Sequence, residues 1–312
     1  MRGAAVIRES TYLVLVLLGV SWITFSMIYL APGDPAELLL SSGLESADPA
    51  RVMAVREELG LNRPLVVQYF AWLKRLASGD LGCSFRTGDP VAREILSRLP
   101  ATLCLAGATF LFTVAGSLAL GLLGALKQNR SADHVIGILG ILSISVPDYW
   151  LGILLILLFS LKLGWLPVMG FDGTTSLILP VFTLGLSMAV VQGRVLRASL
   201  LEIMGQEYIL FARSKGLSGR VIVLRHLLKN ALVPVVVMWG TCLGSLLGGA
   251  VIIESVFAWP GIGKLAVDAV LGRDLPLLQG VVLVMGFSYV LCNRLADLAC
   301  RCLDPRWGRE GR

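Results

Sequence analysis

The sequence predicts an all-α, polytopic membrane protein with six transmembrane helices, and three observations support this prediction. The first is composition, because 56% of the 312 residues are hydrophobic, 15% are charged and the mean hydropathy is +0.79. The second is length, because a helix needs about 20 apolar residues to cross a bilayer. Six stretches meet this requirement: residues 10–30, 101–126, 134–161, 177–198, 231–257 and 277–300. The third is the uneven distribution of Lys and Arg among the loops.

The first apolar stretch has two interpretations. Arg2 and Arg8 precede it, as in a secretory signal peptide. The apolar run is about 20 residues long, however, which suits a membrane span. The segment APGDP that follows at residues 31–35 has no clean small-residue cleavage site. We therefore expect a retained helix.

The positive-inside rule places both termini in the cytoplasm. The short loops 162–176 and 258–276 hold few cations, whereas the other short segments and the termini hold many. The long loop 31–100 carries eight cations and nine acids, but long segments have little weight in this rule. This asymmetry explains the net charge of +6 without nucleic acid as a partner. The cations on the predicted inner side are Arg2, Arg8, Lys127, Arg130, the seven from Arg194 to Lys229, and those from Arg294 to Arg312.

The chain is expected to have three parts. Residues 1–100 form an N-terminal transmembrane helix and an external loop, residues 101–300 form a five-helix core with a cytoplasmic loop at 200–234, and residues 301–312 form a cytoplasmic tail. The external loop contains two helix signals, one from Asp48 to Gly60 and one from Pro64 to Gly79. These helices either brace the first two spans at the membrane interface or form a platform that meets an external partner or gates the outer mouth.

The sequence gives little support for a catalytic or a metal-binding site. The string GIGKL at 261–265 resembles a phosphate-binding loop, but Ala258 and Leu265 occupy positions where that motif needs Gly and Ser or Thr. Both His134 and His226 fall at the edges of spans. The six cysteines show neither a disulfide framework nor zinc-ligand spacing. We expect no catalytic site, no metal site and no cofactor on this chain, so any ATP hydrolysis belongs to a partner.

Asp148 is the best candidate for a residue in the translocation pathway, because a charge within a membrane span is costly and commonly functional. It lies in the sequence SVPDYW, with Pro147 before it and Tyr149 and Trp150 after it. Proline frees a backbone carbonyl, which suits a kink that lines a water-filled cavity. The alternative is a packing kink whose carboxylate pairs with another helix. Glu254 and Asp297 are expected at the membrane interface.

Three glycines of the fifth stretch predict close helix packing. Gly244 and Gly248 form a G-x-x-x-G pattern, and Gly249 follows directly. Small residues at this spacing let two helices approach closely within a bilayer. The partner helix belongs either to this chain or to another subunit.

The segment Glu207–Pro234 is the candidate docking site for a soluble partner. A first amphipathic helix over 207–214 is expected to turn Tyr208, Phe211 and Ala212 toward the membrane body. Gly216 breaks it, because glycine tolerates positive φ. A second helix is expected from Ser218, as its N-cap, to Pro234.

At these residues the sequence resembles the permease subunits of ATP-binding-cassette importers, in the dipeptide/oligopeptide/nickel branch. The segment EY…ARSKGLS…RHLLKNALVP resembles the EAA loop of that branch. Further similar stretches are PGDP at 32–35, TGDPVA at 87–92, RLPATL at 98–103, SVPDYW, residues 252–280 and LDPR at 303–306. The resemblance assigns ATPase coupling to Glu207, Tyr208, Ala212, Arg213, Lys215, Gly216, Leu217, Ser218, His226 and Asn230.

The resemblance implies a type I importer fold (MetI-like) in a bacterial or archaeal cytoplasmic membrane. It also implies four kinds of partner: a second, homologous permease, two ATPase subunits that bind ATP and Mg²⁺, an external solute-binding protein, and the lipid membrane. In such importers the ATPase subunits drive alternating access through the coupling loop.

The cargo is less well defined by the sequence. Several stretches, among them SVPDYWLG and FAWPGIG, look closer to the nickel and metal-chelate members, so nickel or a chelate is favoured over a di- or oligopeptide. The competing class is a self-sufficient secondary transporter or channel, which would need coupling carboxylates or inverted repeats. The hypothesis of an intramembrane enzyme has even less support, because the sequence lacks catalytic groups.

Overall fold

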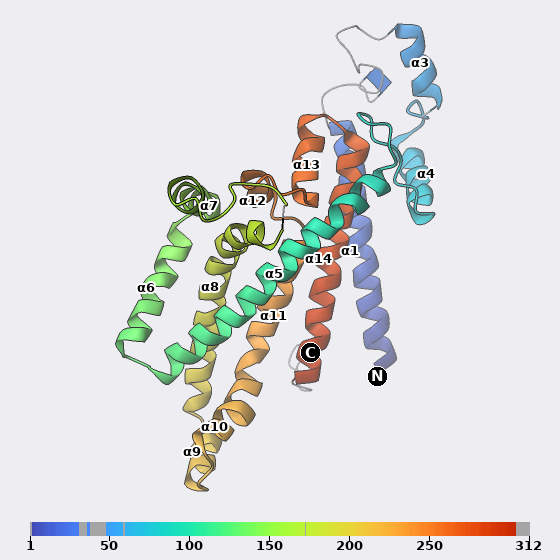
Figure 1. Ribbon diagram of the computed structural model, residues 1–312. Helices are drawn as coiled ribbons and strands as arrows, with labels where there is room; N and C mark the ends of the chain where they lie inside the picture. Colours follow the sequence, from blue (N-terminus) through green and yellow to red (C-terminus); the bar gives the residue numbers. More distant parts are fainter. Residues whose placement is uncertain (1, 31–35, 38–47, 59, 172, 304–312) are drawn as a thin grey trace. The chain divides into compact units, whose positions relative to one another are not determined.

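The computed structural model describes residues 2–30, 36–37, 48–58, 60–171 and 173–303. Its regular secondary structure in this range consists of helices, with one isolated antiparallel bridge between Cys83 and Pro90, which confirms the predicted all-α class. Residues 304–312 of the predicted tail, and the PGDP motif, lie outside the described range. The chain forms two compact units (Figure 1): unit 1 is residues 1–100 with 261–287, and unit 2 is residues 101–260 with 288–312.

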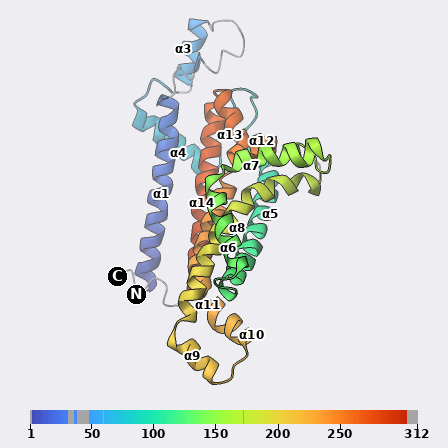
Figure 2. The same cartoon turned by 90° about the vertical axis from the view of Figure 1, so that its left-hand side faces the viewer.

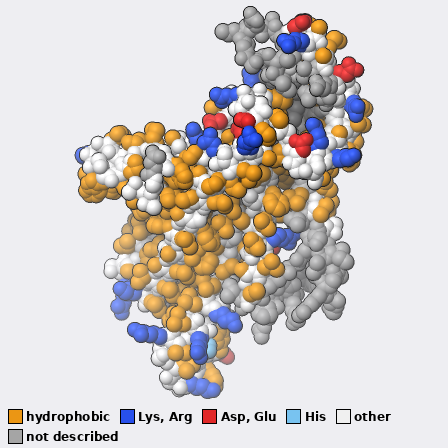
Figure 3. Space-filling view, turned by 45° about the vertical axis from the view of Figure 1, so that its right-hand side comes forward, with side chains coloured by type: hydrophobic (Ala, Val, Ile, Leu, Met, Phe, Trp, Pro, Cys, Tyr) orange, Lys and Arg blue, Asp and Glu red, His pale blue; other side chains and the backbone are white. Residues whose placement is uncertain are grey.

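Four of the described helices are long and apolar enough to cross a membrane. They are α5 (Val91–Leu126), α8 (Ile178–Met204, preceded by the 3-10 turn Thr174–Leu177), the helix Gly219–Leu247, and α14 (Leu275–Leu303). Hydrophobic side chains cover much of the face seen in Figure 3. A bent pair of helices counts as a fifth span at most, and α1 (Arg2–Leu30) contains a shorter apolar stretch, Val14–Met27. Membrane spanning is confirmed, and the count of six spans stays a prediction.

The predicted third span, 134–161, is not one helix. It consists of α6 (Ser131–Ser145) and α7 (Asp148–Leu155), which a π-helical segment extends to Lys162, and the two axes meet at 102°. Val146, with φ −101° and ψ 118°, is extended because the ring of Pro147 disfavours helical backbone in the residue before it. Pro147 therefore separates two helices instead of kinking one (Figure 2).

The predicted fifth span, 231–257, is wrong at both ends. The helix begins at α10 (Gly219–Val221), continues through a π-helical segment (Ile222–Leu227) into α11 (Leu228–Leu247), and carries Pro234 in its interior. It ends where Gly249 adopts φ +88°, a left-handed conformation that glycine takes at little cost. A separate helix, α12 (Val251–Val256), follows.

Unit 1 contains both helices predicted for the external loop. They are α3 (Pro49–Glu58) and α4 (Leu65–Ala77), and the carboxylate of Asp48 accepts a hydrogen bond from the backbone N–H of Ala50 at 3.1 Å. Tyr69 of α4 packs in a cluster with Phe25 of α1 and Trp72, and its hydroxyl lies 2.8 Å from that of Ser21. These aromatic contacts hold α4 against α1.

Residues 261–287 group with unit 1, although the sequence suggested that they belong to the permease core. Helix α13 (Ile262–Leu271) and the start of α14 share a buried apolar cluster with the start of α5. Asp274 reinforces this contact, because its carboxylate accepts hydrogen bonds from Ser84 Oγ and from the backbone N–H of Phe85. The clustered side chains are Val91, Ile95, Ile262, Leu265, Ala269, Leu277 and Val281.

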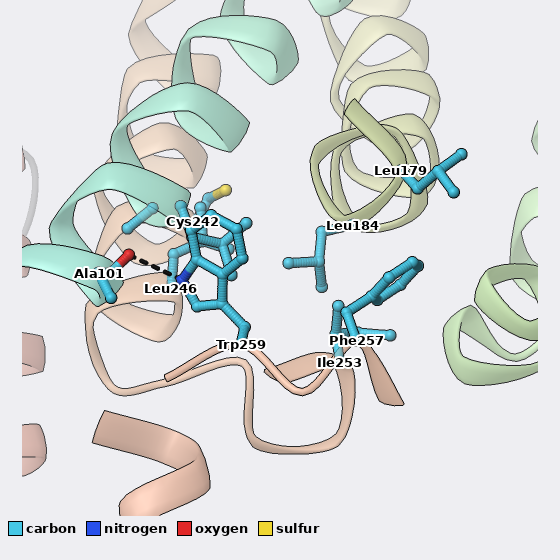
Figure 4. Close-up of a cluster of buried hydrophobic side chains, with 10 residues drawn as sticks. Ala101, Leu179, Leu184, Cys242, Leu246, Ile253, Phe257 and Trp259 are labelled. Carbon is cyan, nitrogen blue, oxygen red and sulfur yellow. Dashed lines mark hydrogen bonds between the residues drawn. The ribbon is translucent and has the colours of Figure 1, made fainter. Parts of the chain in front are cut away.

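Trp259 is at the centre of one apolar core of unit 2 (Figure 4). Its side chain is fully buried, and its indole N–H donates a hydrogen bond to the carbonyl of Ala101 at 2.9 Å. Glu254, in the helix that leads to this core, is also fully buried. Short α12 turns Glu254 into the protein, and the prediction that it lies at the depth of the membrane interface stays a prediction.

Helices α11 and α14 approach each other within unit 2 at two glycines. A Cβ atom placed on Gly240 would lie 2.0 Å from Cβ of Ala296, and one on Gly244 would lie 3.0 Å from the ring of Tyr289. Such small residues bring helix backbones together where no hydrophobic effect favours association.

Gly240→Ala is expected to lower the stability of the permease by about 1–3 kcal/mol, the usual cost of overpacking. Gly107→Ala is the matched control, because this glycine also lies inside a helix and nothing would lie within 4 Å of the new methyl group. Thermal unfolding in detergent measures both variants. Equal midpoints for the two would contradict the close contact at Gly240.

Candidate functional site

Helix α9 (Glu207–Ser214) lies at one end of unit 2, between α8 and α10 (Figures 1 and 2). Ile209 is fully buried and Ala212 nearly so. Both pack in a cluster with Leu200 of α8 and with Ile222 and Leu227 of the next helix. Because residues three apart share one helix face, these two side chains anchor α9 to the bundle.

The expectation that Tyr208 and Phe211 face the membrane body is wrong. Tyr208 is 43% exposed and Phe211 is 60% exposed, because the buried face runs through the positions next to them. The hydroxyl of Tyr208 accepts a hydrogen bond from the side-chain amide of Asn230 at 3.1 Å, which ties α9 to α11. The ammonium of Lys215 lies 4.5 Å from the centre of the Phe211 ring, within cation–π range.

Gly216 forms the turn after α9. Its φ is +77°, and its N–H donates to the carbonyl of Arg213 at 2.9 Å. No atom lies within 4 Å of the place where a Cβ would sit, so it is the backbone conformation and not a lack of space that favours glycine here. Ser218 occupies the predicted N-cap position of α10, with φ −65° and ψ 147°, but its hydroxyl makes no capping hydrogen bond.

The surface around α9 is both basic and apolar. Lys and Arg side chains gather at this end in Figure 3. Leu210 is 70% exposed, Leu224 is 66% exposed, and Leu217 is also exposed, while His226 is half-buried. Exposed apolar residues ringed by charge are typical of a protein interface. The exposed cations are Arg213, Lys215, Arg220, Arg225 and Lys229.

Asp148 lies at the start of α7, where it accepts a hydrogen bond from the hydroxyl of Ser187 on α8 at 2.9 Å. It lines an open cavity of about 350 Å³ together with Tyr149, and about half of Tyr149 and of Trp150 is exposed. Pro147 is exposed as well. The carboxylate thus both touches another helix and borders a cavity, and its place in the translocation pathway stays a prediction.

Two further open cavities follow α8 beyond Ser187. The first, of about 400 Å³, lies between α8 and α11 and is lined by Ser187, Gln192, Thr241 and Cys242 among others. The second, of about 760 Å³, lies between α6 and α8. Val191 lines both, so the three cavities follow one another along one helix.

The cavity of about 760 Å³ is lined by two arginines, Arg194 and Arg197, that the sequence analysis counted only as loop cations. Arg197 forms a two-point ion pair with Asp133, with distances of 2.6 and 2.7 Å. Arg194 lies across Gly140, because a Cβ there would be 2.6 Å from Cδ of Arg194. The position of Arg194 could have shown that it is not a loop residue, because it lies inside the long apolar stretch Thr174–Met204.

The three glycines predicted for helix packing have different roles in the structure. Gly244 lies against Tyr289 of α14. Gly248 follows the last residue of α11, and Gly249 carries the positive φ that ends it. The last two therefore terminate a helix.

The family comparisons decide the class of this protein. Residues 117–309 match the family described as binding-protein-dependent transport system inner membrane component, and residues 4–106 match the N-terminal region described for such membrane components. The chain belongs to this permease family. It is therefore a multi-pass inner-membrane protein, a permease component of ATP-binding-cassette importers, and the alternative of a self-sufficient secondary transporter or channel falls away.

Curated relatives align with nearly the whole permease. The glutathione transport system permease protein GsiC of Escherichia coli strain K12 is 39% identical over 300 residues, which cover 96% of this chain and 97% of the relative. A putative peptide transport system permease of Brucella melitensis biotype 1 is 40% identical over 314 residues, covering 98% and 99%.

A solved structure shows the same fold. An inward-facing form of the MetNI methionine ABC transporter aligns with a TM-score of 0.56 and 20% identity, covering 67% of the permease and 95% of that chain. The predicted MetI-like fold class is thereby confirmed.

Ile209→Ala is expected to loosen α9, because it removes a fully buried side chain at a typical cost of about 2–5 kcal/mol. Its neighbour Leu210 is 70% exposed, so Leu210→Ala is the matched control and leaves α9 in place. Hydrogen exchange of the amides of α9 reports the difference. Equal exchange in both variants would show that Ile209 does not anchor the helix.

Proposed function

We propose that this permease carries short peptides inward and that α9, with the turn at Gly216, is the element through which ATPase subunits drive it. The observation that carries the proposal is the two-sided character of α9. One side is fixed to the bundle by Ile209 and Ala212, and the other offers exposed apolar and basic side chains to a partner. A helix fixed in this way transmits a push from outside to the helices behind it.

The proposed complex contains two homologous permeases, two ATPase subunits and an external solute-binding protein. ATP and Mg²⁺ belong to the ATPase subunits, and this chain binds no cofactor. Both termini and α9 lie in the cytoplasm. Positive charge supports this topology, since the cations of α9 and its neighbours gather at one end of unit 2.

Peptide is the proposed cargo, in place of the nickel or metal chelate that the sequence favoured. Two lines support the change. The relatives described above are named for glutathione and for peptide transport. The cavities along α8 also offer hydroxyl, amide and charged groups suited to a zwitterionic peptide, namely Ser187, Gln192, Thr241 and Asp148.

The cargo assignment is tested with the complete complex reconstituted in liposomes. A di- or tripeptide delivered by the binding protein is expected to stimulate ATP hydrolysis and to accumulate inside. Free nickel and nickel chelates, tested in parallel, are expected to do neither. Stimulation by nickel or its chelate alone would overturn the peptide assignment.

Gly216→Val is expected to separate ATP hydrolysis from transport. A β-branched residue at φ +77° carries strain of about 1–3 kcal/mol, which shifts the turn after α9. We expect the peptide transported per ATP to fall roughly tenfold, which corresponds to a loss of about 1.4 kcal/mol, while membrane insertion is unchanged.

Two controls accompany this variant. Gly216→Asn keeps the left-handed conformation that asparagine tolerates, so transport should be largely retained. Gly219→Ala adds a methyl group nearby, where nothing lies within 4 Å and φ is not positive. Normal coupling in Gly216→Val would remove the turn from the proposed mechanism.

A further inference from the structure

Arg194 is a cation inside a membrane-spanning helix. It lies in the apolar segment Thr174–Met204, ten residues before its end. Its side chain crosses α6 at Gly140, the tenth residue of that 15-residue helix. By the helical rise of 1.5 Å per residue, this contact lies about 13 Å from the start of α6. The guanidinium group is therefore well within the span.

No described residue neutralises this charge. The nearby acid, Asp133, is engaged by Arg197 through two short contacts and by the backbone N–H of Asn129 at 3.0 Å. Arg194 itself is exposed to the open cavity of about 760 Å³ and forms no ion pair or hydrogen bond with the described part of the chain. Charged residues within membranes nearly always face a water-filled cavity or a partner instead of lipid.

The absence of a side chain at Gly140 leaves room for Arg194. A side chain at position 140 would collide with it, since a Cβ there would be 2.6 Å from Cδ and 2.9 Å from Nη1 of Arg194. Apolar side chains of α6, including Ile138, Ile141 and Ile144, line the same cavity. Apolar walls strengthen a charge-assisted hydrogen bond, because they lower the local dielectric constant.

A second polar side chain, that of Ser187, lies on the same face of α8 as Arg194. Ser187, which holds Asp148 by a hydrogen bond of 2.9 Å, precedes Arg194 by seven residues. Seven residues are close to two turns, so both side chains leave the helix on one face, with their Cα atoms about 10 Å apart. Val191, between them, lines the cavities on both sides.

We propose that Arg194 binds the terminal carboxylate of a peptide cargo, while Asp148, held by Ser187, receives its ammonium group. An extended chain spans about 3.3–3.6 Å per residue, so two or three residues place opposite charges about 7–11 Å apart. The separation of about 10 Å between the Cα atoms of Ser187 and Arg194 falls within that range. This inference rests on the proposed peptide transport and names the residues that would select for a zwitterionic cargo.

The test uses the complete complex in liposomes, with a tripeptide that has a free C-terminal carboxylate and the same tripeptide as its C-terminal amide. Binding of each peptide to the purified complex without the binding protein is measured as well. Arg194→Gln is expected to weaken binding and uptake of the free acid at least about tenfold, the effect of losing one hydrogen bond to a charged group. Binding and uptake of the amide should be equal for Arg194→Gln and for the unchanged protein.

Gly140→Ala provides a second variant that leaves Arg194 in the sequence but displaces its side chain. It should show the same selective loss for the free acid. Gly137→Ala is its matched control, because this glycine lines the same cavity and nothing would lie within 4 Å of the added methyl group. Basal ATP hydrolysis and uptake of both peptides should be unchanged in Gly137→Ala.

Four results would overturn the inference. Equal loss for acid and amide, or no loss for either, would show that Arg194 does not read the carboxylate. Failure of Arg194→Gln to assemble with the second permease would assign Arg194 to subunit packing. A change only in the dependence of transport on anionic lipid would assign it to a lipid headgroup. Absence of peptide transport in the unchanged complex would instead contradict the proposed function itself.

Discussion

The close approach of α5 and α8 is the contact on which the candidate sites of unit 2 depend. A Cβ on Gly116 would lie 2.9 Å from Cβ of Ala189, and one on Gly121 would lie 2.8 Å from Leu196. Within a bilayer, lipid tails are as apolar as the side chains, so helices associate mainly through such tight packing. Because α5 covers one side of α8 in this way, the opposite side is left for cavities and polar contacts.

Helix α8 connects the cavities to the proposed coupling element. It carries Ser187, Arg194 and Arg197 along its length, and α9 follows its end after two residues. Leu200, near that end, shares the apolar cluster that buries Ile209 of α9. A displacement of α9 by a partner would therefore move the wall of the cavities directly, since a continuous helix of 27 residues transmits displacement along its axis.

Hydropathy and charge predicted the class and most spans of this permease, but not their breaks. Apolar runs identify segments that belong in a membrane, yet an average over such a run does not register a change of direction. The ring of Pro147 forces Val146 out of the helix, and Gly249 ends another helix by its positive φ. Both residues were noticed in the sequence, one as a kink and one as a packing residue. Their backbone effect depends on neighbours that only the fold supplies.

The prediction for the coupling segment was correct in position and partly wrong in orientation. Helix 207–214 and the turn at Gly216 lie where the sequence placed them. The buried face, however, belongs to Ile209 and Ala212, and not to Tyr208 and Phe211. In a helix of eight residues, apolar side chains occur on more than one face, so periodicity cannot select the one that packs. The cluster with Leu200 and Leu227 selects it.

The position of Arg194 within a membrane span was missed for a related reason. Counting cations by loop, as the positive-inside rule requires, assigns a charge to the nearest segment end and ignores its depth in a helix. Arg197 has Asp133 as a partner within the chain and serves structure, whereas Arg194 lies one turn deeper on the same helix and faces an open cavity. A transporter must hold its cargo weakly enough to release it. Two single contacts, one for each end of a small zwitterion, meet that need better than one strong site, because breaking either contact leaves the cargo attached at only one end.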